Sequence, residues 1–497
     1  MWTASITHPK VTWQSESLRI VGSSRLLRIR AGRDAPVRGV GNATEINHDG
    51  FGASGFNGHF GRPSGLRSLK PSAIWSFLKR QPASYWFVSI YLFFEYVRPQ
   101  SIYAAIEGPP YARAVIILAL VFFLLEQRRL RFGAPEILLS IFSLIVVASS
   151  FTAFLPSASY ANLSLYFSWV LIYLLIANAV DTEERFLIFT LSFLLYSFKM
   201  SQFGTRSWAQ NGFAFRDWGV TGAPGWFQNS GEFGIQMCIF LPLVVAFVFA
   251  LKDHWPPWMR WVAWGIAGTA VIGIVASSSR GALVGCGAVV LWLILKSRRR
   301  ARVLITTVVL AGLVYVIIPP EQRLRFQQAG DDKTSIARTT AWKQGLEMMR
   351  DHPILGIGYD NWNEYHTINY GYRMLPHNVF IQAGAELGYT GLLGFIALIG
   401  CTFVINRRTR KLAERMPERG RFIFFMAHGL DGALVGFLAS GFFVTVLYYP
   451  YFWINLAMTV ALNNAAINTL SGAQTSPPLS RPAPGRGGIR GAVRPAP

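Results

Sequence analysis

Long stretches without charged side chains recur along most of this chain and are separated by short polar segments. Residues 233–251, 261–279, 303–320 and 387–406 contain no Asp, Glu, Lys or Arg. Each approaches the roughly 20 apolar residues with which an α-helix crosses a bilayer. The stretch 137–180 is long enough for two such helices. Further apolar segments lie at 84–97, 112–125, 186–200, 281–296 and from 432 onward. The pattern predicts an all-α polytopic membrane protein with about 12 transmembrane helices.

The basic residues between these stretches indicate an orientation, because Lys and Arg gather in cytoplasmic connections. With a cytoplasmic N-terminus, the inner connections are 126–134, 181–185, 252–260, 296–302 and 406–421. The outer connections are 98–112, 155–160, 201–232, 278–280 and 319–377. Every short, strongly basic connection then falls on the inner side. Shifting the count by one helix would scatter these connections over both sides, so this topology is favoured.

Two outer connections, 201–232 and 319–377, are long. Loops beyond about 15 residues are uncommon unless they are functional or disordered. Both mix Trp, Gly, Arg and Asp, and neither is of low complexity. An interfacial aromatic belt is the alternative interpretation. The mixture of residue types favours a folded site on the outer face.

The two ends of the chain carry much of its net charge of +22. Residues 1–80 hold 12 Lys and Arg against 4 Asp and Glu, and residues 471–497 hold 4 Arg and no acidic residue. Neither end shows hydrophobic periodicity, so we expect a basic disordered cytoplasmic tail at 1–80 and a disordered Pro-, Gly- and Arg-rich tail at 471–497. Residues 81–470 then form the membrane domain. We expect the tails to contact lipid headgroups or fix orientation, with no nucleic-acid partner.

The composition excludes several other classes. Only 14% of the residues are charged and 52% are hydrophobic, which argues against ordinary water-soluble domains. The three cysteines all lie in apolar runs, so neither a disulfide framework nor a thiolate metal site is indicated. The acidic pair Asp331-Asp332 has no further ligands at a readable spacing. We therefore expect no metal site and no cofactor.

A short motif between two apolar stretches is the first candidate for chemistry. Ser277-Ser278-Ser279-Arg280-Gly281 joins them with almost no loop, which places Arg280 at the outer end of a tight helical hairpin. Burying the charge of an arginine at that depth costs free energy unless an anionic partner is present. The planar guanidinium matches the geometry of phosphate oxygens. The alternative is an arginine that only reaches the membrane interface. The polar residues around it favour an anion site.

The second candidate region is the connection 319–377. Residues 335–346 have the pattern of an amphipathic helix that carries Arg338. A Gly-punctuated turn follows at 352–361, and the connection closes with His377 immediately before the next apolar stretch. A single histidine is more often structural than catalytic. Its titration near neutral pH nevertheless suits it to act as a base or to donate to phosphate.

The order of these motifs resembles the O-antigen ligase family. The features that carry the resemblance are Ser279-Arg280-Gly281, Arg338 ahead of Trp342, His352-Pro353 with Gly356 and Gly358, His377-Asn378, and Glu386-Leu387-Gly388. The resemblance covers roughly residues 200–400. The segment Glu95–Gln100 is similar to a branch of ligase-like proteins associated with exosortase systems.

The resemblance implies a metal-independent glycosyltransferase that inverts the anomeric configuration. It would move a glycan from undecaprenyl diphosphate to a hydroxyl of a lipid, protein or polysaccharide acceptor. The reaction would occur at the periplasmic face of the bacterial inner membrane. Arg280 and Arg338 would hold the diphosphate, and His377 would activate the acceptor hydroxyl. The family often has Pro-Asn ahead of the sixth helix, whereas this chain has Gln228-Asn229, so Asn229 is expected only to pack.

Further residues are weaker candidates. Arg206, Arg216 and Arg373 are outer-face cations that could bind phosphate or sugar. Glu386 could support the site as a buried carboxylate or pair with a neighbouring helix. His428 and Asp431 share one helix face, either as a structural pair or as a proton relay. The rival functions are a polysaccharide polymerase, which must bind the same diphosphate, and a transporter or flippase that uses the intramembrane acids.

Overall fold

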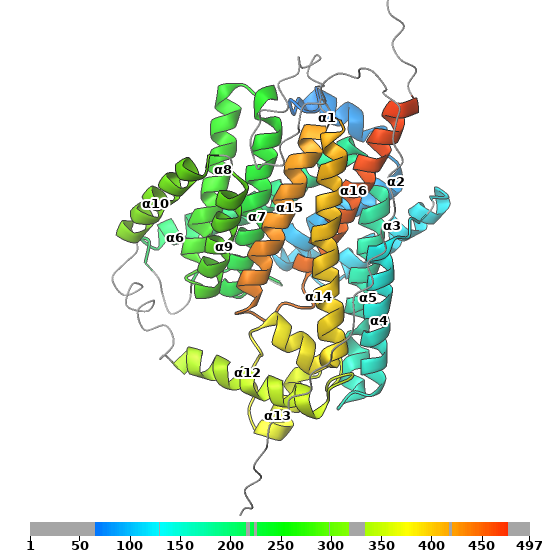
Figure 1. Cartoon of the computed structure of the whole chain (residues 1–497), viewed down its shortest axis with the longest axis vertical. Helices are drawn as coiled ribbons and strands as arrows, with labels where there is room; N and C mark the ends of the chain where they lie inside the picture. Colours follow the sequence, from blue (N-terminus) through cyan, green and yellow to red (C-terminus); the bar gives the residue numbers. More distant parts are fainter. Residues whose placement is uncertain are drawn as a thin grey trace, which may run out of the picture. The chain divides into compact units, whose positions relative to one another are not determined.

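The computed structural model describes residues 65–475 except 129, 215–218, 223–225, 298, 318–332 and 417–419. This part is helical and contains no strand among the described residues (Figure 1). The helices are α1 Pro71–Leu78, α2 Ala83–Leu92, α3 Tyr111–Leu125, α4 Ala134–Phe151, α5 Pro156–Ala179, α6 Glu183–Gln210, α7 Ser230–Leu251, α8 Pro257–Ala276, α9 Arg280–Lys296, α10 Arg300–Ile317, α12 Lys333–Asp351, α13 Trp362–Tyr370, α14 Val379–Glu414, α15 Gly420–Gly441 and α16 Pro450–Thr475. The all-α prediction is confirmed.

Within the described residues, seven helices are long and apolar enough to cross a membrane: α4, α5, α6, α7 with the turn that follows it, α8, α14 and α15. Helices α9 and α3 coincide with predicted apolar stretches but have only 17 and 15 residues. The chain is therefore a multi-pass membrane protein, and the count of about 12 helices stays a prediction.

Helix α7 is the central helix of the bundle. In its most apolar part 94% of the residues are buried, against 33% in α8. A helix that is apolar all round must be covered by other helices or by lipid. Helix α15 packs along α7, and a Cβ at Gly436 would come within 2.8 Å of the Cys238 carbonyl oxygen. Small residues at such positions let two membrane helices approach closely.

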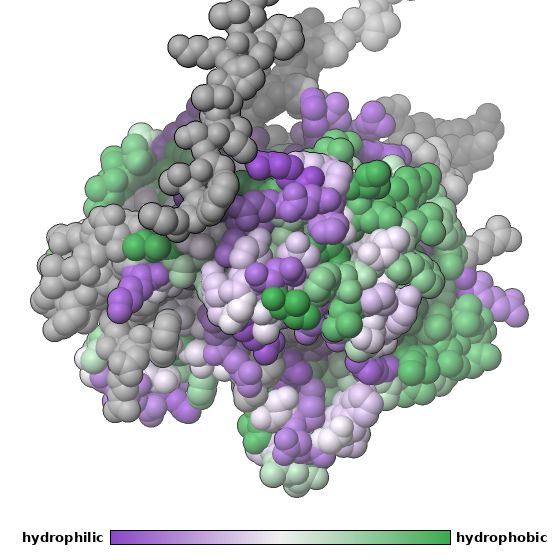
Figure 2. Space-filling model, turned by 90° about the horizontal axis from the view of Figure 1, so that it is seen from below, coloured by the Kyte–Doolittle hydropathy of each residue, from purple (hydrophilic) through white to green (hydrophobic). Residues whose placement is uncertain are grey.

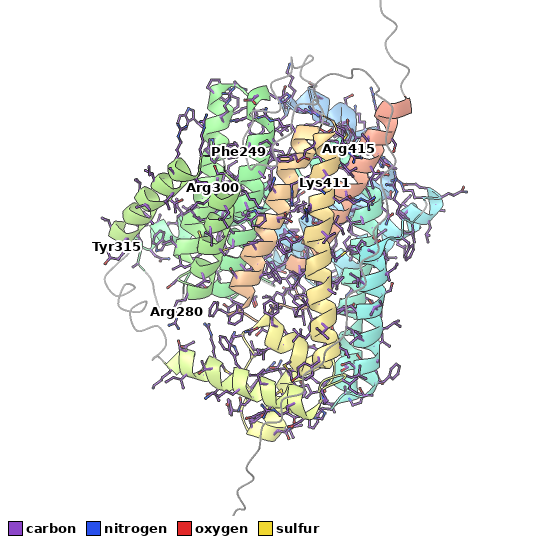
Figure 3. The ribbon with its side chains drawn as sticks, viewed as in Figure 1. Phe249, Arg280, Arg300, Tyr315, Lys411 and Arg415 are labelled. Atoms are coloured by element: carbon purple, nitrogen blue, oxygen red, sulfur yellow. The ribbon has the colours of Figure 1, made fainter. Side chains whose placement is uncertain are left out.

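The inner connections predicted from their basic residues meet at one end of the bundle. Arg421 forms an ion pair with Asp253, which joins the start of α15 to the connection after α7. Arg128 lies 3.8 Å from Asp181, which joins two more of these connections. Lys411 and Arg415 lie toward this end, and Arg280 lies toward the opposite one (Figure 3).

The opposite end carries α12 and α13, which cover the ends of the membrane helices (Figure 1). Viewed from this end, hydrophilic and intermediate residues gather over the middle of the face, and hydrophobic residues lie toward its edge (Figure 2). This distribution matches a polar end and apolar sides, as a bilayer requires. The described part of the connection 319–377, from residue 333 onward, contains the helices α12 and α13, as expected for a folded element.

Some predicted boundaries differ from the structure. Helix α1 lies within the range 1–80 that the sequence assigned to a disordered tail, so that assignment is wrong for its last part. Residues 1–64 lie outside the described residues. Helix α6 continues to Gln210, inside the predicted loop 201–232. Helix α16 continues to Thr475, five residues past the predicted domain end. Polar residues continue these helices beyond their apolar parts, so apolar pattern alone misses their ends.

Candidate functional site

The motif Ser277–Gly281 forms the predicted tight hairpin between α8 and α9. The Ser279 hydroxyl accepts a hydrogen bond from the backbone N–H of Ala282, so it caps α9 at its N-terminus. Arg280 is the first residue of α9 and is half-buried. A Cβ at Gly281 would lie 2.9 Å from Phe443, so the hairpin packs closely against the connection between α15 and α16.

Helix α12 brings Arg338 to the same end. Its buried residues Ala341, Gly345 and Met348 recur at helical spacing and turn one face toward the bundle. Trp342 lies on the neighbouring row, and its ring packs 5.3 Å from that of Phe442. Arg338 precedes Trp342 by four residues, so both side chains extend from one side of the helix.

His377 lies two residues before the start of α14, in the segment that follows α13. Its backbone N–H donates to the Thr445 hydroxyl at 2.9 Å, and its φ is +45°, a region that non-glycine residues seldom adopt. Asn378 then caps α14 by accepting from the N–H groups of Phe380 and Ile381. Burial and, to a smaller extent, the positive charge of Arg338 together lower the pKa of the His377 imidazole to about 4. The ring is therefore neutral near pH 7.

Helix α14 is interrupted nine residues after its start. Gly388 has φ +68° and ψ −172°, so the helix breaks and carbonyls before the break lose their intrahelical partners. The turn 352–361 supplies new donors: Ile357 N–H bonds to the Ala385 carbonyl and Gly358 N–H to the Glu386 carbonyl. These bonds fix the short first half of α14, and with it the position of the Glu386 side chain.

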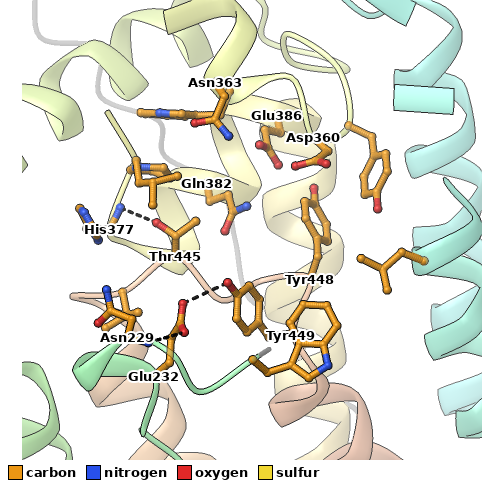
Figure 4. Close-up of a pocket in the computed structure, with 17 residues that line it drawn as sticks. Asn229, Glu232, Asp360, Asn363, His377, Gln382, Glu386, Thr445, Tyr448 and Tyr449 are labelled. Carbon is orange, nitrogen blue, oxygen red and sulfur yellow. Dashed lines mark hydrogen bonds between the residues drawn. The ribbon is translucent and has the colours of Figure 1, made fainter. Parts of the chain in front are cut away.

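A cavity of about 240 Å³ opens between these elements (Figure 4). It is bounded by the start of α7, the turn before α13, the first half of α14 and the connection between α15 and α16. The ionisable residues of its wall are Glu232, Asp360, His377 and Glu386. Aromatic rings form much of the remaining wall: Trp226, Tyr359, Trp362, Tyr448 and Tyr449. Polar groups in an aromatic cavity are typical of a small-molecule site.

Glu232 is held in place by two contacts. The Tyr449 hydroxyl donates to its Oε1 at 3.0 Å, and the backbone N–H of Asn229 donates to its Oε2 at 3.3 Å. The side chain of Asn229 in turn caps α7 by accepting from Gly231 N–H at 2.7 Å. Asn229 and Glu232 thus form a capping box. Because this box lines the cavity, the role of Asn229 extends beyond packing.

Asp360 forms another part of the wall. Its backbone has φ +53°, and its Oδ2 accepts from the Asn162 side chain at 2.7 Å. Burial and the nearby charge of Glu364 raise the pKa of Asp360, the bond from Asn162 opposes them, and the net result is a pKa of about 6. A carboxyl group with this pKa titrates close to neutral pH.

The residues chosen from sequence are only partly brought together. His377 and Glu386 line the cavity, and Arg338 acts electrostatically on His377. Arg280 lies at the hairpin packed against Phe443, two residues from Thr445. Arg206 and Arg373 are exposed and do not line the cavity. Arg216 lies outside the described residues.

Sequence reasoning missed most of the carboxylate wall. The spacing Asn229-x-x-Glu232 is a capping-box pattern that could have drawn attention to Glu232. No local signal marks Asp360, because its proximity to α14 comes from the turn 352–361. Among the described residues, no group of three or more His, Cys, Asp and Glu has an arrangement that could hold a metal ion.

Comparisons with known proteins agree with the placement of these motifs. Residues 265–396 match the family model described as O-antigen ligase. The chain is similar to an O-antigen ligase of Pseudomonas aeruginosa, with 27% identity over 159 residues, 32% of this chain and 38% of that protein. It is also similar to the exopolysaccharide production protein ExoQ of Rhizobium meliloti, with 31% identity over 103 residues, 18% of this chain and 23% of that protein. The chain thus matches well under half of the length of either relative.

The matched range contains Arg280, Arg338 and His377. It begins within α8 and ends within α14, so it includes the hairpin, α12 and the first half of α14. The resemblance of this chain to the O-antigen ligase family is thereby confirmed over residues 265–396.

Proposed function

We propose that this protein transfers a glycan from an undecaprenyl-diphosphate carrier to an acceptor hydroxyl. The reaction takes place at the outer face of the bacterial inner membrane, at the end of the bundle that carries α12 and α13. This orientation rests on the basic connections at the opposite end, which the positive-inside rule assigns to the cytoplasm. The acceptor is a lipid, a protein or a polysaccharide.

The observation that carries the proposal is the placement of α12, the helix of Arg338, against the segment of His377: Trp342 bonds to the Pro376 carbonyl, and His377 lines the cavity. A transferase of this class needs cations beside the leaving diphosphate and a base beside the acceptor. Arg338 supplies one cation and the Arg280 hairpin another at the same end. Preorganised charges of this kind stabilise the negative charge that develops as a bond to phosphate breaks.

The proposed step follows from these positions. The acceptor oxygen bonds to the anomeric carbon as the bond from that carbon to the diphosphate oxygen breaks. The bonding electrons leave with the diphosphate, whose added charge Arg280 and Arg338 stabilise. The neutral imidazole of His377 takes the proton of the acceptor hydroxyl. Because a bound diphosphate offsets the charge of Arg338, donor binding raises the pKa of His377 and makes it a stronger base.

A polymerase would use the same donor site and differ only in its acceptor, which would be a second lipid-linked glycan. The name of the ExoQ relative, an exopolysaccharide production protein, is compatible with that alternative. A transporter would place its functional acids at mid-depth in the membrane. In this protein, Asp431 of α15 is bound by Arg410 and Asn406 of α14, as expected for a structural ion pair.

Reconstitution tests the proposal. Purified protein in liposomes is given a polyprenyl-diphosphate-linked glycan and candidate acceptors, with and without a chelator. We expect glycan transfer that a chelator does not affect and that Arg280→Ala abolishes. Arg350→Ala, an exposed arginine of α12, is the matched control and keeps activity. Movement of the glycan across the bilayer without covalent transfer would favour the transporter.

A further inference from the structure

The cavity has a chemical character that a diphosphate site does not need. Three of its wall residues are acids from separate elements: Glu232 from α7, Asp360 from the turn before α13 and Glu386 from α14. None of the described residues that line it is Lys or Arg. Like charges repel strongly in a partly dehydrated site. A diphosphate is therefore excluded from this cavity and belongs beside the arginines.

Several polar atoms of the wall are buried and have few hydrogen-bond partners of good geometry among the described residues. Glu386 is only 1% exposed, and its Oε2 forms no hydrogen bond of acceptable geometry within the described residues. The hydroxyl of Tyr448 interacts with this carboxyl group, and the Oδ1 of Asn363 is likewise buried without a partner of acceptable geometry among the described residues. Glu386 and Tyr448 both point into the cavity (Figure 4). Buried polar atoms are nearly always satisfied in folded proteins, so these atoms indicate a ligand that donates several hydrogen bonds.

The aromatic residues fit the other face of such a ligand. The rings of Trp226 and Tyr449 meet at 4.8 Å with 63° between their planes, so they form a corner of the wall. The guanidinium of Arg98 lies 5.7 Å from the Trp226 ring centre and forms a cation–π contact that helps to hold the ring. A sugar ring combines hydroxyl donors at its edge with an apolar C–H face. Carboxylates and aromatic rings match these two surfaces.

The size of the cavity limits the ligand further. Its volume of about 240 Å³ is below the roughly 300–1,000 Å³ of pockets that enclose drug-sized molecules. One sugar ring fits, and a longer chain must extend outside. His377 lies on the cavity wall and also feels the charge of Arg338, so it is placed between the cavity and the cationic region. The cavity is therefore on the side from which an acceptor hydroxyl reaches His377.

We propose that this cavity binds one uncharged or ammonium-bearing sugar ring of the acceptor and rejects sugars that carry a carboxylate. The proposal rests on the glycan-transfer function above and adds the chemical class of the acceptor residue. Its hydroxyls donate to Glu386, Asp360 and Glu232, and its C–H face lies against Trp226 and Tyr449. The rejection of acidic sugars arises from repulsion by the Asp360 carboxylate in a cavity that is only partly open to water.

Saturation-transfer NMR on the full-length protein in nanodiscs tests the proposal with three probes. These are methyl glucoside, methyl glucosaminide and methyl glucuronide. We expect the first two to bind and the glucuronide to bind about tenfold more weakly or less. Asp360→Asn removes one negative charge from the wall and should narrow the difference in affinity between the glucuronide and the other two probes several-fold. Asp351→Asn, at the exposed end of α12, should leave it unchanged.

The outcomes separate this proposal from the transferase function. Equal binding of the three probes, or no binding, in a preparation that transfers glycan overturns the cavity assignment and leaves the function intact. If the protein binds the probes selectively but transfers no glycan from any lipid-linked donor, the proposed glycan-transfer function is overturned. Arg280→Ala should lose transfer and retain selective probe binding. A donor sugar could occupy the cavity instead: displacement of the probes by the intact donor but not by undecaprenyl diphosphate would overturn the acceptor assignment.

Discussion

The indole N–H of Trp342 donates a hydrogen bond to the carbonyl oxygen of Pro376 at 2.9 Å. This bond joins α12 to the residue immediately before His377. Arg338 lies one helical turn from Trp342, so the bond sets how close its guanidinium comes to the imidazole. A contact between two residues that have no chemical role thus positions two that do.

Removing this hydrogen bond should slow transfer without unfolding the protein. Trp342→Phe keeps a ring against Phe442 but leaves the Pro376 carbonyl without its donor. We expect kcat/KM for transfer to fall roughly tenfold, with a small loss of thermal stability. Trp264→Phe, on the surface of α8, is the control and should change neither. An unchanged pH profile and rate in Trp342→Phe would show that the bond does not position Arg338.

The pKa of His377 should depend on the charge of Arg338. Arg338 lowers that pKa, so Arg338→Ala should raise it. The acidic limb of the plot of kcat/KM against pH then shifts toward higher pH. Arg338→Lys retains a positive charge and should keep the limb near its original position. The measurement is the pH dependence of transfer by both variants, supported by ¹⁵N NMR of the imidazole. A limb that moves to lower pH in Arg338→Ala would contradict the assignment.

His377 should also make folding stability depend on pH. Its pKa is about 4 in the folded protein and about 6.5 in an unfolded chain. The folded state therefore binds fewer protons, and stability is fully present above about pH 6.5 and is lost as the pH falls toward 4. His377→Gln should remove part of this slope in Tm measured between pH 4 and 7. His352→Gln, an exposed histidine at the end of α12, should keep it.

Loss of the α7 cap should affect both stability and activity. Asn229→Ala removes the hydrogen bond to Gly231 N–H and costs about 1 kcal/mol. It also disturbs the capping box that holds Glu232 in the cavity wall. Thr182→Ala removes a similar cap from α6, where the hydroxyl accepts from Arg185 N–H at the other end of the bundle. We expect similar decreases in Tm but a loss of transfer activity only in Asn229→Ala.

The break in α14 should tolerate only glycine. At Gly388 a Cβ would come within 2.4 Å of the Ile354 carbonyl oxygen, and its backbone angles suit no other residue. Gly388→Ala should therefore destabilise the protein by more than about 2 kcal/mol and displace the turn 352–361. Gly400→Ala in the same helix meets no atom within 4 Å and should be neutral or slightly stabilising. Comparable expression and Tm of the two variants would contradict this account.

Residue patterns along the chain were sufficient to predict most of the long helices and to select three candidate site residues. Apolar stretches located α4 to α10 and the helical parts of α14 to α16, because each span must be apolar on its own. The order of the motifs along the chain was enough to single out Arg280, Arg338 and His377. Predicted loop limits were less accurate, since polar residues extend α6 and α16 past their apolar segments.

Only the tertiary structure assembled the carboxylate cavity. Its wall combines Glu232 with Asp360 and Glu386, which lie more than a hundred residues further along the chain. Asp360 comes close to Glu386 because the turn 352–361 forms hydrogen bonds to the carbonyls before the break in α14. A local pattern reports which face of a helix is apolar, and it cannot report which distant carbonyl a turn will bind. Each membrane-spanning segment must be apolar by itself, so its position can be predicted from the local sequence. The site depends on hydrogen bonds between segments, which exist only after the helices have packed.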